Sequence, residues 1–325
     1  MSSAVQDLVF AAFLCNATVA GGECEDWARR AGVLLKTWFL DTDTQMLPNL
    51  YYGQISPRAS PPIVKGHGGF IEWTDLPRLL DHVQLLRYSY PSVWTEADHN
   101  LFTAWVTAFN DYVDGKEARG ERDMENNHGT WYDNTWHGVA FFAGNMTDAT
   151  AAATEVNQRR ITQQVKSDGK QWIELERTNP AGYCIYNLQA YANNADQAKN
   201  TGGAVNNWDF VSTEGGSIRK ALDFLLPFAT GGQPWPYPQI EPPAWSGLFE
   251  TLRRASIAYQ SRAYEVAACQ VVKAAAAISW PPAGGSWLQP VTRFPRVDSV
   301  RQPLQVQYGS DPLDLYVPAI YAVTC

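Results

Sequence analysis

Apolar residues recur at helical spacing along most of the chain, and this periodicity restricts the possible folds more than any other feature of the sequence. The first predicted helices cover residues 5–16 and 25–40, and Trp27, Leu34 and Trp38 share one face of the second. Further helical patterns cover 72–90, 95–116, the region that starts near Asn127, 149–167, 179–195, 217–229, 243–260 and 262–279. Few stretches alternate as strands do, and neither a linker nor a fixed repeat is visible. We therefore predict one all-α domain of antiparallel helix pairs over residues 1–325, with an irregular Pro-rich tail from about residue 280.

Local signals mark where some of these helices begin. Thr95 followed by Asp98 fits a capping box, in which two side chains satisfy backbone N–H groups at the helix start. Asn179 before Pro180 also fits a helix start, because Pro is favoured at the first helical position. By contrast, residues 49–70 are rich in Gly, Pro, Ser and Tyr. We interpret them as a long irregular loop, of the kind that is often functional.

Charge and hydropathy argue against some classes of protein. The formal net charge of −8 argues against nucleic-acid binding, which needs an extended basic surface. The chain has no run of 18 apolar residues, so we expect no membrane span. The apolar segment Leu8–Leu14 lacks a basic flank and follows Asp7. We interpret it as part of a core helix rather than as a signal peptide.

The five cysteines lack the spacing of metal ligands, and no dinucleotide or phosphate motif stands out. We therefore expect no metal and no cofactor. Cys15 and Cys24 could bridge the ends of a helical hairpin, or both could be buried free thiols. The 13 Trp, 15 Tyr and 13 Phe suit stacking on sugar rings, and they suit bulky helix packing equally well.

The stretch Glu125–Asp133 carries amides, an imidazole, a phenol and carboxylates in nine residues. If the chain is helical from Asn127, His128 and Tyr132 share a face at an i, i+4 spacing, and Trp131 lies beside them. An apolar run begins at Val139. This order predicts a helix that starts in a cleft and continues into the core.

A second polar stretch follows at 174–188. Arg177 lies just before the predicted cap, Tyr183 lies in the first helical turn, and Asn187 shares its face. This arrangement indicates a cationic pocket that contains a titratable phenol. A surface pair of Arg177 with a Glu, beside a core Tyr, is the alternative.

Together the two stretches suit the elimination of a 4-linked sugar from a uronate. The reaction removes the C5 proton, stabilises charge on the carboxylate and protonates the leaving oxygen. Amides and Arg177 can stabilise the enolate-like carboxylate. A Tyr or His can act as base, and a Tyr can return the proton. A phenol with an ordinary pKa of about 10 acts as base only where a cation stabilises phenolate.

Several segments resemble the alginate lyase family with an (α/α) toroid fold. They are Thr37-Trp38-Phe39-Leu40-Asp41, Asn49-Leu50-Tyr51-Tyr52-Gly53-Gln54, Asn126–Asp133, Glu174–Thr178 with Tyr183 six positions after Arg177, Leu222–Pro227 and Trp235–Ile240. The resemblance covers about residues 25–240. It implies an incomplete (α/α) toroid with a long cleft. It also implies a lyase that cleaves a β-1,4-linked uronic acid polymer, with mannuronate-rich alginate and glucuronan as the two leading substrates.

The resemblance also implies residue roles. Asn127 and His128, together with Arg177, would neutralise the substrate carboxylate, and Tyr183 would serve as base and acid. His128 could instead be the base for one C5 epimer, because the two epimers present the proton from opposite faces. Gly182 stands where the family often has a His, and Asn179 stands where a second Arg is common.

Other residues are candidates for substrate contacts. Tyr51, Tyr52 and Gln54 could stack on or hydrogen-bond to sugars, and His67 in the same loop could reach the cleft. Ordinary loop packing or exposure is the alternative for each. Trp73 and Trp131 are candidate stacking platforms, and Arg219 is a candidate ligand for a uronate carboxylate. Tyr132 and Asn187 are further candidates for substrate contacts. Core packing for Trp131 and a surface pair for Arg219 are the alternatives.

Two other functions remain open from the sequence. A glycoside hydrolase on the same architecture could use Asp133 and Glu125 as its carboxylate pair. A sugar-binding protein without catalysis is the second alternative. In each case we expect the protein to bind an acidic polysaccharide and to be a monomer. The triplets Asn16-Ala17-Thr18 and Asn145-Met146-Thr147 fit the glycosylation pattern, and on that limited basis we expect secretion.

Overall fold

The computed structural model describes residues 1–18, 22–54 and 66–277. Its elements are α1 (Ser2–Thr18), α2 (Gly22–Phe39), η1 (Gly66–Glu72), α3 (Leu76–Ser89), α4 (Glu96–Asp114), α5 (Arg119–Arg122), α6 (Asn127–Phe142), α7 (Met146–Glu155), η2 (Val156–Ile161), α8 (Thr162–Gln164), α9 (Trp172–Leu175), α10 (Pro180–Asn200), α11 (Ile218–Ala229), η3 (Trp245–Leu248), α12 (Phe249–Ala258) and α13 (Arg262–Ala277). Within these ranges there is no strand, only an isolated bridge between Val165 and Gln171. The all-α prediction is therefore confirmed. The predicted tail from about residue 280 lies outside the described residues.

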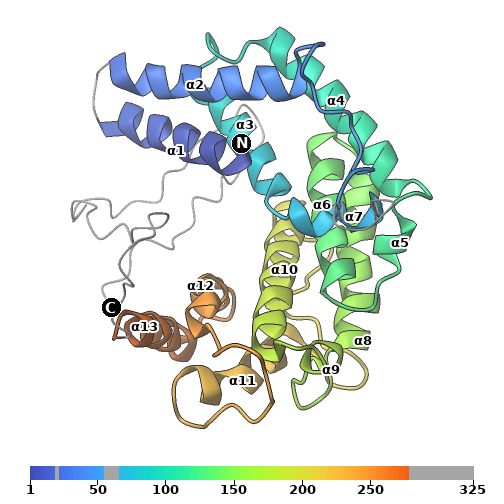
Figure 1. The fold of residues 1–325 in the computed structure, drawn as a ribbon, viewed down its shortest axis with the longest axis vertical. Coiled ribbons are helices and arrows are strands. Elements are labelled where there is room, and N and C mark those ends of the chain that lie inside the picture. The colour runs from blue at the N-terminus through green and yellow to red at the C-terminus, as the bar shows by residue number, and fades with distance from the viewer. Residues whose placement is uncertain (19–21, 55–65, 278–325) are drawn as a thin grey trace.

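The helices follow one another around an incomplete ring (Figure 1). The pair α1 and α2 lies at one end of the ring and the pair α12 and α13 at the other. Helix α10 lies towards the inside, where it packs against α6 and α7 and also contacts α12. The prediction of a single domain for the whole chain stays a prediction.

Two clusters of buried apolar side chains support this ring. The first joins α1–α4 to α6, which contributes Tyr132, Trp136 and Val139. The second joins η2 and α10–α13. The contact between α6 and α10 is polar by comparison: the side chain of Asn194 donates to the Thr130 carbonyl at 3.0 Å, and Gln197 donates to Asn134 at 2.7 Å. A polar seam therefore runs between the two apolar clusters.

The predicted capping signals lie where the helices begin. In α4, the backbone N–H of Asp98 donates to Thr95 Oγ1 at 3.2 Å, and the Thr95 N–H donates to the Asp98 carboxylate at 3.0 Å. The capping-box prediction is confirmed, and such a cap contributes about 1 kcal/mol to helix stability. Helix α10 begins at Pro180 after Asn179, as predicted, but the Asn179 side chain makes no capping hydrogen bond.

Some boundaries differ from the helical patterns in the sequence. The helix predicted over 149–167 begins at Met146, and it passes through a π-helical turn, η2, before it ends at Gln164. The helix predicted over 243–260 is divided into the 3-10 helix η3 and helix α12. The predicted loop 49–70 contains the start of η1. Periodicity misses these changes because π and 3-10 stretches of only four to six residues are too short to shift the apolar pattern, although they change both the hydrogen-bond register and the residues per turn.

A disulfide joins Cys15 of α1 to Cys24 of α2, so of the two alternatives the bridge across the helical hairpin is confirmed. Cys184 is a buried free thiol. None of the helices described here is both long and apolar enough to cross a membrane.

Candidate active site

The first turn of α6 presents the residues of the first polar stretch. Asn126 is the N-cap residue, and its side-chain oxygen accepts a hydrogen bond from the backbone N–H of His128 at 3.1 Å. Asn127 and His128 therefore occupy fixed positions in this turn. The next residue must be small: a Cβ added to Gly129 would lie 2.3 Å from the Met124 carbonyl oxygen and 2.5 Å from a guanidinium nitrogen of Arg160.

Glu174 of the short helix α9 binds the first residue of α6. One of its carboxylate oxygens accepts from the Asn127 backbone N–H at 2.6 Å, and both accept from the Asn127 side-chain nitrogen at 3.0 Å. Both residues are 1% exposed. Burial raises the pKa of Glu174, although the bonds from Asn127 act in the opposite direction. The contact joins the two polar stretches that lie about 50 residues apart in the sequence.

Arg177 and Tyr183 form the second part of the site. The Arg177 guanidinium lies 3.9 Å from the centroid of the Tyr183 ring, which is the geometry of a cation–π contact. The same guanidinium lies 3.9 Å from the Glu174 carboxylate, and the Arg177 side chain is 33% exposed. The predicted pair of cation and phenol is thus present, and it connects through Glu174 to Asn127.

His128 contacts a carboxylate that the sequence analysis did not select. Its Nδ1 is hydrogen-bonded to Glu121 Oε1, and the side chains are 19% and 2% exposed, respectively. Glu121 belongs to α5, a helix of four residues that carries no periodic signal. In the sequence, only its position seven residues before His128 in a charged turn could have indicated this contact.

The structure corrects two expected substrate contacts. Tyr132 is 1% exposed and donates its hydroxyl to the Val113 carbonyl at 2.7 Å. Burial also raises the pKa of its phenol. Asn187 is fully buried and donates to Gln164 at 2.8 Å and to Gln171 at 2.9 Å. Both residues lie on the predicted helix faces, beside His128 and Tyr183 respectively, but neighbouring elements cover the faces at these two positions.

The tryptophan platforms are also packed against protein. Trp131 is 4% exposed, and its ring lies 4.9 Å from that of Tyr186, which confirms the core-packing alternative. Trp73 is half-buried and stacks on Phe39 at 6.2 Å. Arg219 lies on α11, where its guanidinium is 4.0 Å from the centroid of the Tyr259 ring, so it has an aromatic partner within the protein.

The loop candidates lie at the surface of the first half of the ring. Tyr51 and Tyr52 are 48% and 75% exposed. Gln54 has a left-handed backbone with φ of 53°, and its N–H donates to the Glu72 carboxylate at 3.1 Å. His67 belongs to η1, but its side chain lies outside the described part of the structure.

The carboxylate pair proposed for a hydrolase is not available in this structure. Asp133 is fully buried and binds Arg160 through both oxygens, at 2.7 and 3.0 Å. Glu125 is exposed. A carboxylate engaged in this way can neither protonate a leaving group nor activate a water without breaking a buried ion pair.

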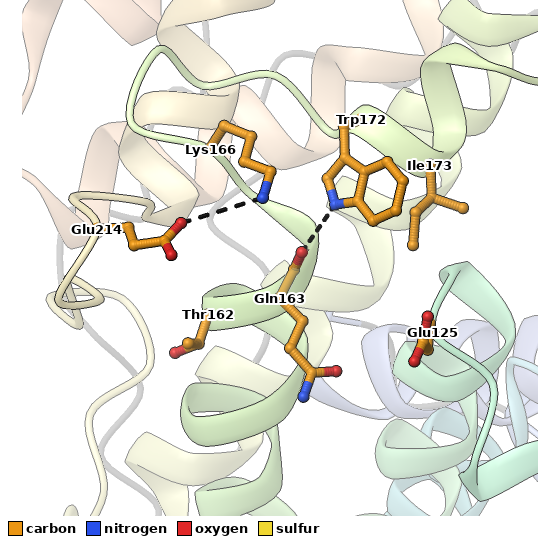
Figure 2. Close-up of a pocket in the computed structure, with 7 residues that line it drawn as sticks. All are labelled: Glu125, Thr162, Gln163, Lys166, Trp172, Ile173 and Glu214. Atoms are coloured by element: carbon orange, nitrogen blue, oxygen red, sulfur yellow. Dashed lines mark hydrogen bonds and ion pairs between the residues drawn. The ribbon is translucent and has the colours of Figure 1, made fainter.

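Two surface pockets lie beside the residues of the second polar stretch. One, of about 390 Å³, lies at the start of α10 and is lined by Thr178, Asn179, Gly182, Tyr183, Tyr186, Ile240 and Glu241. It contains the predicted catalytic phenol. The other, of about 360 Å³, is lined by residues that include Trp172 and Ile173, the neighbours of Glu174. Figure 2 shows the Trp172 ring held by a bond to the Gln163 carbonyl, with Lys166 directed towards Glu214.

The chain matches known proteins in two comparisons. A sequence model of the alginate lyase family matches residues 15–235. The structure is similar to that of an alginate lyase from Bacteroides ovatus, with a TM-score of 0.73 and 30% identity over 83% of this chain and 69% of that chain. No curated protein matches the chain.

The fold and the family define a polysaccharide lyase with an (α/α) toroid fold, which confirms the expected fold and class of enzyme. The chain belongs to the alginate lyase family. Its substrate is accordingly an acidic polysaccharide.

Proposed function

We propose that this lyase cleaves a β-1,4-linked uronic acid polymer by β-elimination, with Arg177, His128 and Tyr183 acting on the sugar that loses its C5 proton. The observation that supports this most directly is the continuous contact of Arg177 with both Tyr183 and Glu174, because Glu174 in turn holds the residue beside His128. A cation, a phenol and an imidazole are thereby gathered where the two polar stretches meet.

Arg177 is proposed to bind the uronate carboxylate. A guanidinium has five N–H donors and suits a carboxylate in two-point geometry. Its distance of 3.9 Å to Glu174 is longer than a hydrogen bond, and a third of its side chain is exposed. Donors therefore remain for a substrate. Their bonds strengthen as the carboxylate becomes enolate-like, which lowers the barrier to C5 deprotonation.

Tyr183 and His128 are the groups proposed to move protons. Tyr183 lines the 390 Å³ pocket, and His128 is partly exposed. With two candidates, one can remove the C5 proton while the other protonates the departing 4-oxygen. Mannuronate and guluronate present this proton from opposite faces, so the C5 epimer that is cleaved depends on which of the two groups lies beside C5.

Asn127 is proposed to position Glu174, in addition to any contact that it makes with the sugar itself. Its side-chain nitrogen is already bound to both Glu174 oxygens, and the residue is 1% exposed. This clamp keeps Glu174 beside Arg177 and keeps His128 at the helix start. Exposed Tyr51 and Tyr52 are proposed as contacts for more distant sugars of the polymer.

The test is the ultraviolet absorbance of the unsaturated uronate product, with polymannuronate, polyguluronate and glucuronan supplied separately. We expect a rise with at least one polymer, and its loss in His128→Ala and Tyr183→Phe. Reducing ends without a rise in absorbance would instead indicate hydrolysis. Polymer binding without any product would indicate a binding protein.

We also propose that the protein acts outside the cell as a monomer. The disulfide between Cys15 and Cys24 supports an oxidising compartment. Detection of the oxidised protein in culture medium would test the location, and its mass by light scattering would test the oligomeric state.

A further inference from the structure

Glu121 is a buried carboxylate in direct contact with the His128 ring. The residue is 1% exposed, and its Oε1 is hydrogen-bonded to Nδ1 of His128. Its backbone N–H donates to the Ala118 carbonyl at 3.0 Å, and α5 packs against both α6 and η1. The carboxylate is therefore held against the imidazole by the fold rather than by a mobile side chain at the surface.

We propose that Glu121 is a positioning residue that makes His128 the general base of the elimination. It does so by keeping the proton of neutral His128 on Nδ1, which leaves the lone pair on Nε2, and by offsetting the positive charge after Nε2 takes up a proton. This inference rests on the proposed function, because it assigns the role of base within that reaction.

The chemistry of the two groups fixes the proton. An ionised carboxylate only accepts hydrogen bonds, so the atom facing it must be N–H. A neutral imidazole has one donor nitrogen and one acceptor nitrogen, and the bond made by one determines the state of the other. Neutral His128 therefore presents an acceptor at Nε2. In that state it cannot donate to a substrate carboxylate, and this function is left to Arg177.

Charge compensation supports the same role. An imidazolium in a partly buried site is costly unless a negative group lies beside it. Glu121 supplies that group from α5. Glu174 from α9 and Arg177 also lie in this region, where they carry opposite charges 3.9 Å apart. The hydroxyl of Tyr186, on α10, donates a hydrogen bond to the Ile71 carbonyl at 3.2 Å. Burial raises the pKa of this phenol to about 12, so Tyr186 stays neutral.

The proton balance of the step is then complete. The C5–H bond breaks and its proton passes to Nε2 of His128. The electron pair forms the C4–C5 double bond as the bond from C4 to the glycosidic oxygen breaks. That oxygen takes the hydroxyl proton of Tyr183, and the resulting phenolate and imidazolium return to neutral by proton exchange with water.

The experiment combines ¹⁵N NMR of the histidine side chains with steady-state kinetics. His128→Gln assigns the His128 signals. The test variants are Glu121→Ala, which removes the acceptor, and Glu121→Gln, which keeps the shape and removes the charge. Glu155→Gln is the matched control. Glu155 lies in α7 and pairs at 3.2 Å with Arg122, which belongs to α5 as Glu121 does, and it has no contact with His128. Thermal melts compare the folding of all variants.

In the wild type and in Glu155→Gln, we expect neutral His128 to carry its proton on Nδ1, with Nε2 unprotonated. In Glu121→Ala the proton should move largely to Nε2. Glu121→Gln should lower kcat by about 10- to 100-fold with a smaller change in KM, since the lost interaction forms as charge develops on His128.

Two results would overturn the inference: a wild-type His128 protonated on Nε2 when neutral, or a folded Glu121→Gln enzyme with unchanged kcat. Failure of the proposed function has a different signature. In that case no polymer yields unsaturated product with the wild type, although the NMR spectrum still shows the proton on Nδ1.

Discussion

Arg160 and Asp133 form a two-point ion pair inside the protein, with side chains 1% and 0% exposed. Two further guanidinium N–H groups donate to the Met124 carbonyl at 2.9 Å and to the Arg122 carbonyl at 2.8 Å. Arg160 lies in the π-helical turn η2. This one side chain therefore connects η2 to the middle of α6 and to the backbone between Glu121 and His128. The ion pair supports the site without facing the substrate.

Removing one member of this pair is expected to destabilise the protein strongly. Asp133→Asn would leave the Arg160 charge buried without its counter-ion, and we expect the free energy of unfolding to fall by about 3–5 kcal/mol. Urea unfolding measures this change. The control is Asp123→Asn, because Asp123 is 64% exposed and binds the neighbouring Arg159 at 3.1 Å. Its loss should cost less than about 1 kcal/mol. Equal effects in the two variants would contradict the expectation.

Phe substitutions at Tyr183 and Tyr132, one in each polar stretch, should have opposite effects on activity and stability. Tyr183→Phe is expected to abolish elimination and leave stability nearly unchanged, because Tyr183 lines a surface pocket. Tyr132→Phe is expected to retain activity and to lower stability by about 1 kcal/mol, since it removes the buried bond to the Val113 carbonyl. Product absorbance and thermal melts distinguish the two effects. An active Tyr183→Phe enzyme would exclude Tyr183 as the acid.

Stability should fall in acid through His137. This residue is fully buried in α6, and burial lowers its pKa to about 4. The unfolded chain has a His pKa of about 6.5. Between these values the unfolded state binds more protons than the folded state, so stability decreases as pH falls, by up to about 1.4 kcal/mol per pH unit.

The measurement is urea unfolding of the wild type and of His137→Leu across pH 4 to 7, the window set by those two pKa values. Other groups titrate in both proteins, so the difference between the two curves isolates His137. The stability of the wild type relative to His137→Leu should decrease as the pH is lowered. Parallel curves would show that His137 is not held neutral by burial.

The disulfide should stabilise the α1–α2 hairpin. Cys15 and Cys24 are separated by nine positions, and closing so short a loop is worth about 2.5–3 kcal/mol in the chain-entropy description. The double variant Cys15→Ala/Cys24→Ala should show a corresponding loss in the free energy of unfolding. Adding a reductant should lower wild-type stability by more than it lowers that of the variant, because Cys269 is also disulfide-bonded and stays so in the variant. A wild type that is insensitive to reductant would contradict this account.

Local sequence patterns determined much of this fold. The helical periods, the Thr95–Asp98 capping box and the Asn179-Pro180 helix start depend on residues a few positions apart. The same local argument placed Arg177 beside Tyr183, because only one helix start separates them. The family resemblance then indicated the toroid, which helical periodicity by itself does not specify.

The tertiary structure decided which polar groups are open to a substrate. Tyr132 and Asn187 occupy the helix faces that their spacing predicts, but other elements of the chain cover these two positions and leave His128 and Tyr183 partly open. Glu121 gains its contact with His128 because α5 packs against α6. Spacing along a helix specifies a side chain's direction, since the helical period is local. Its burial and its partners depend on how separate elements pack against one another, which helical spacing does not specify.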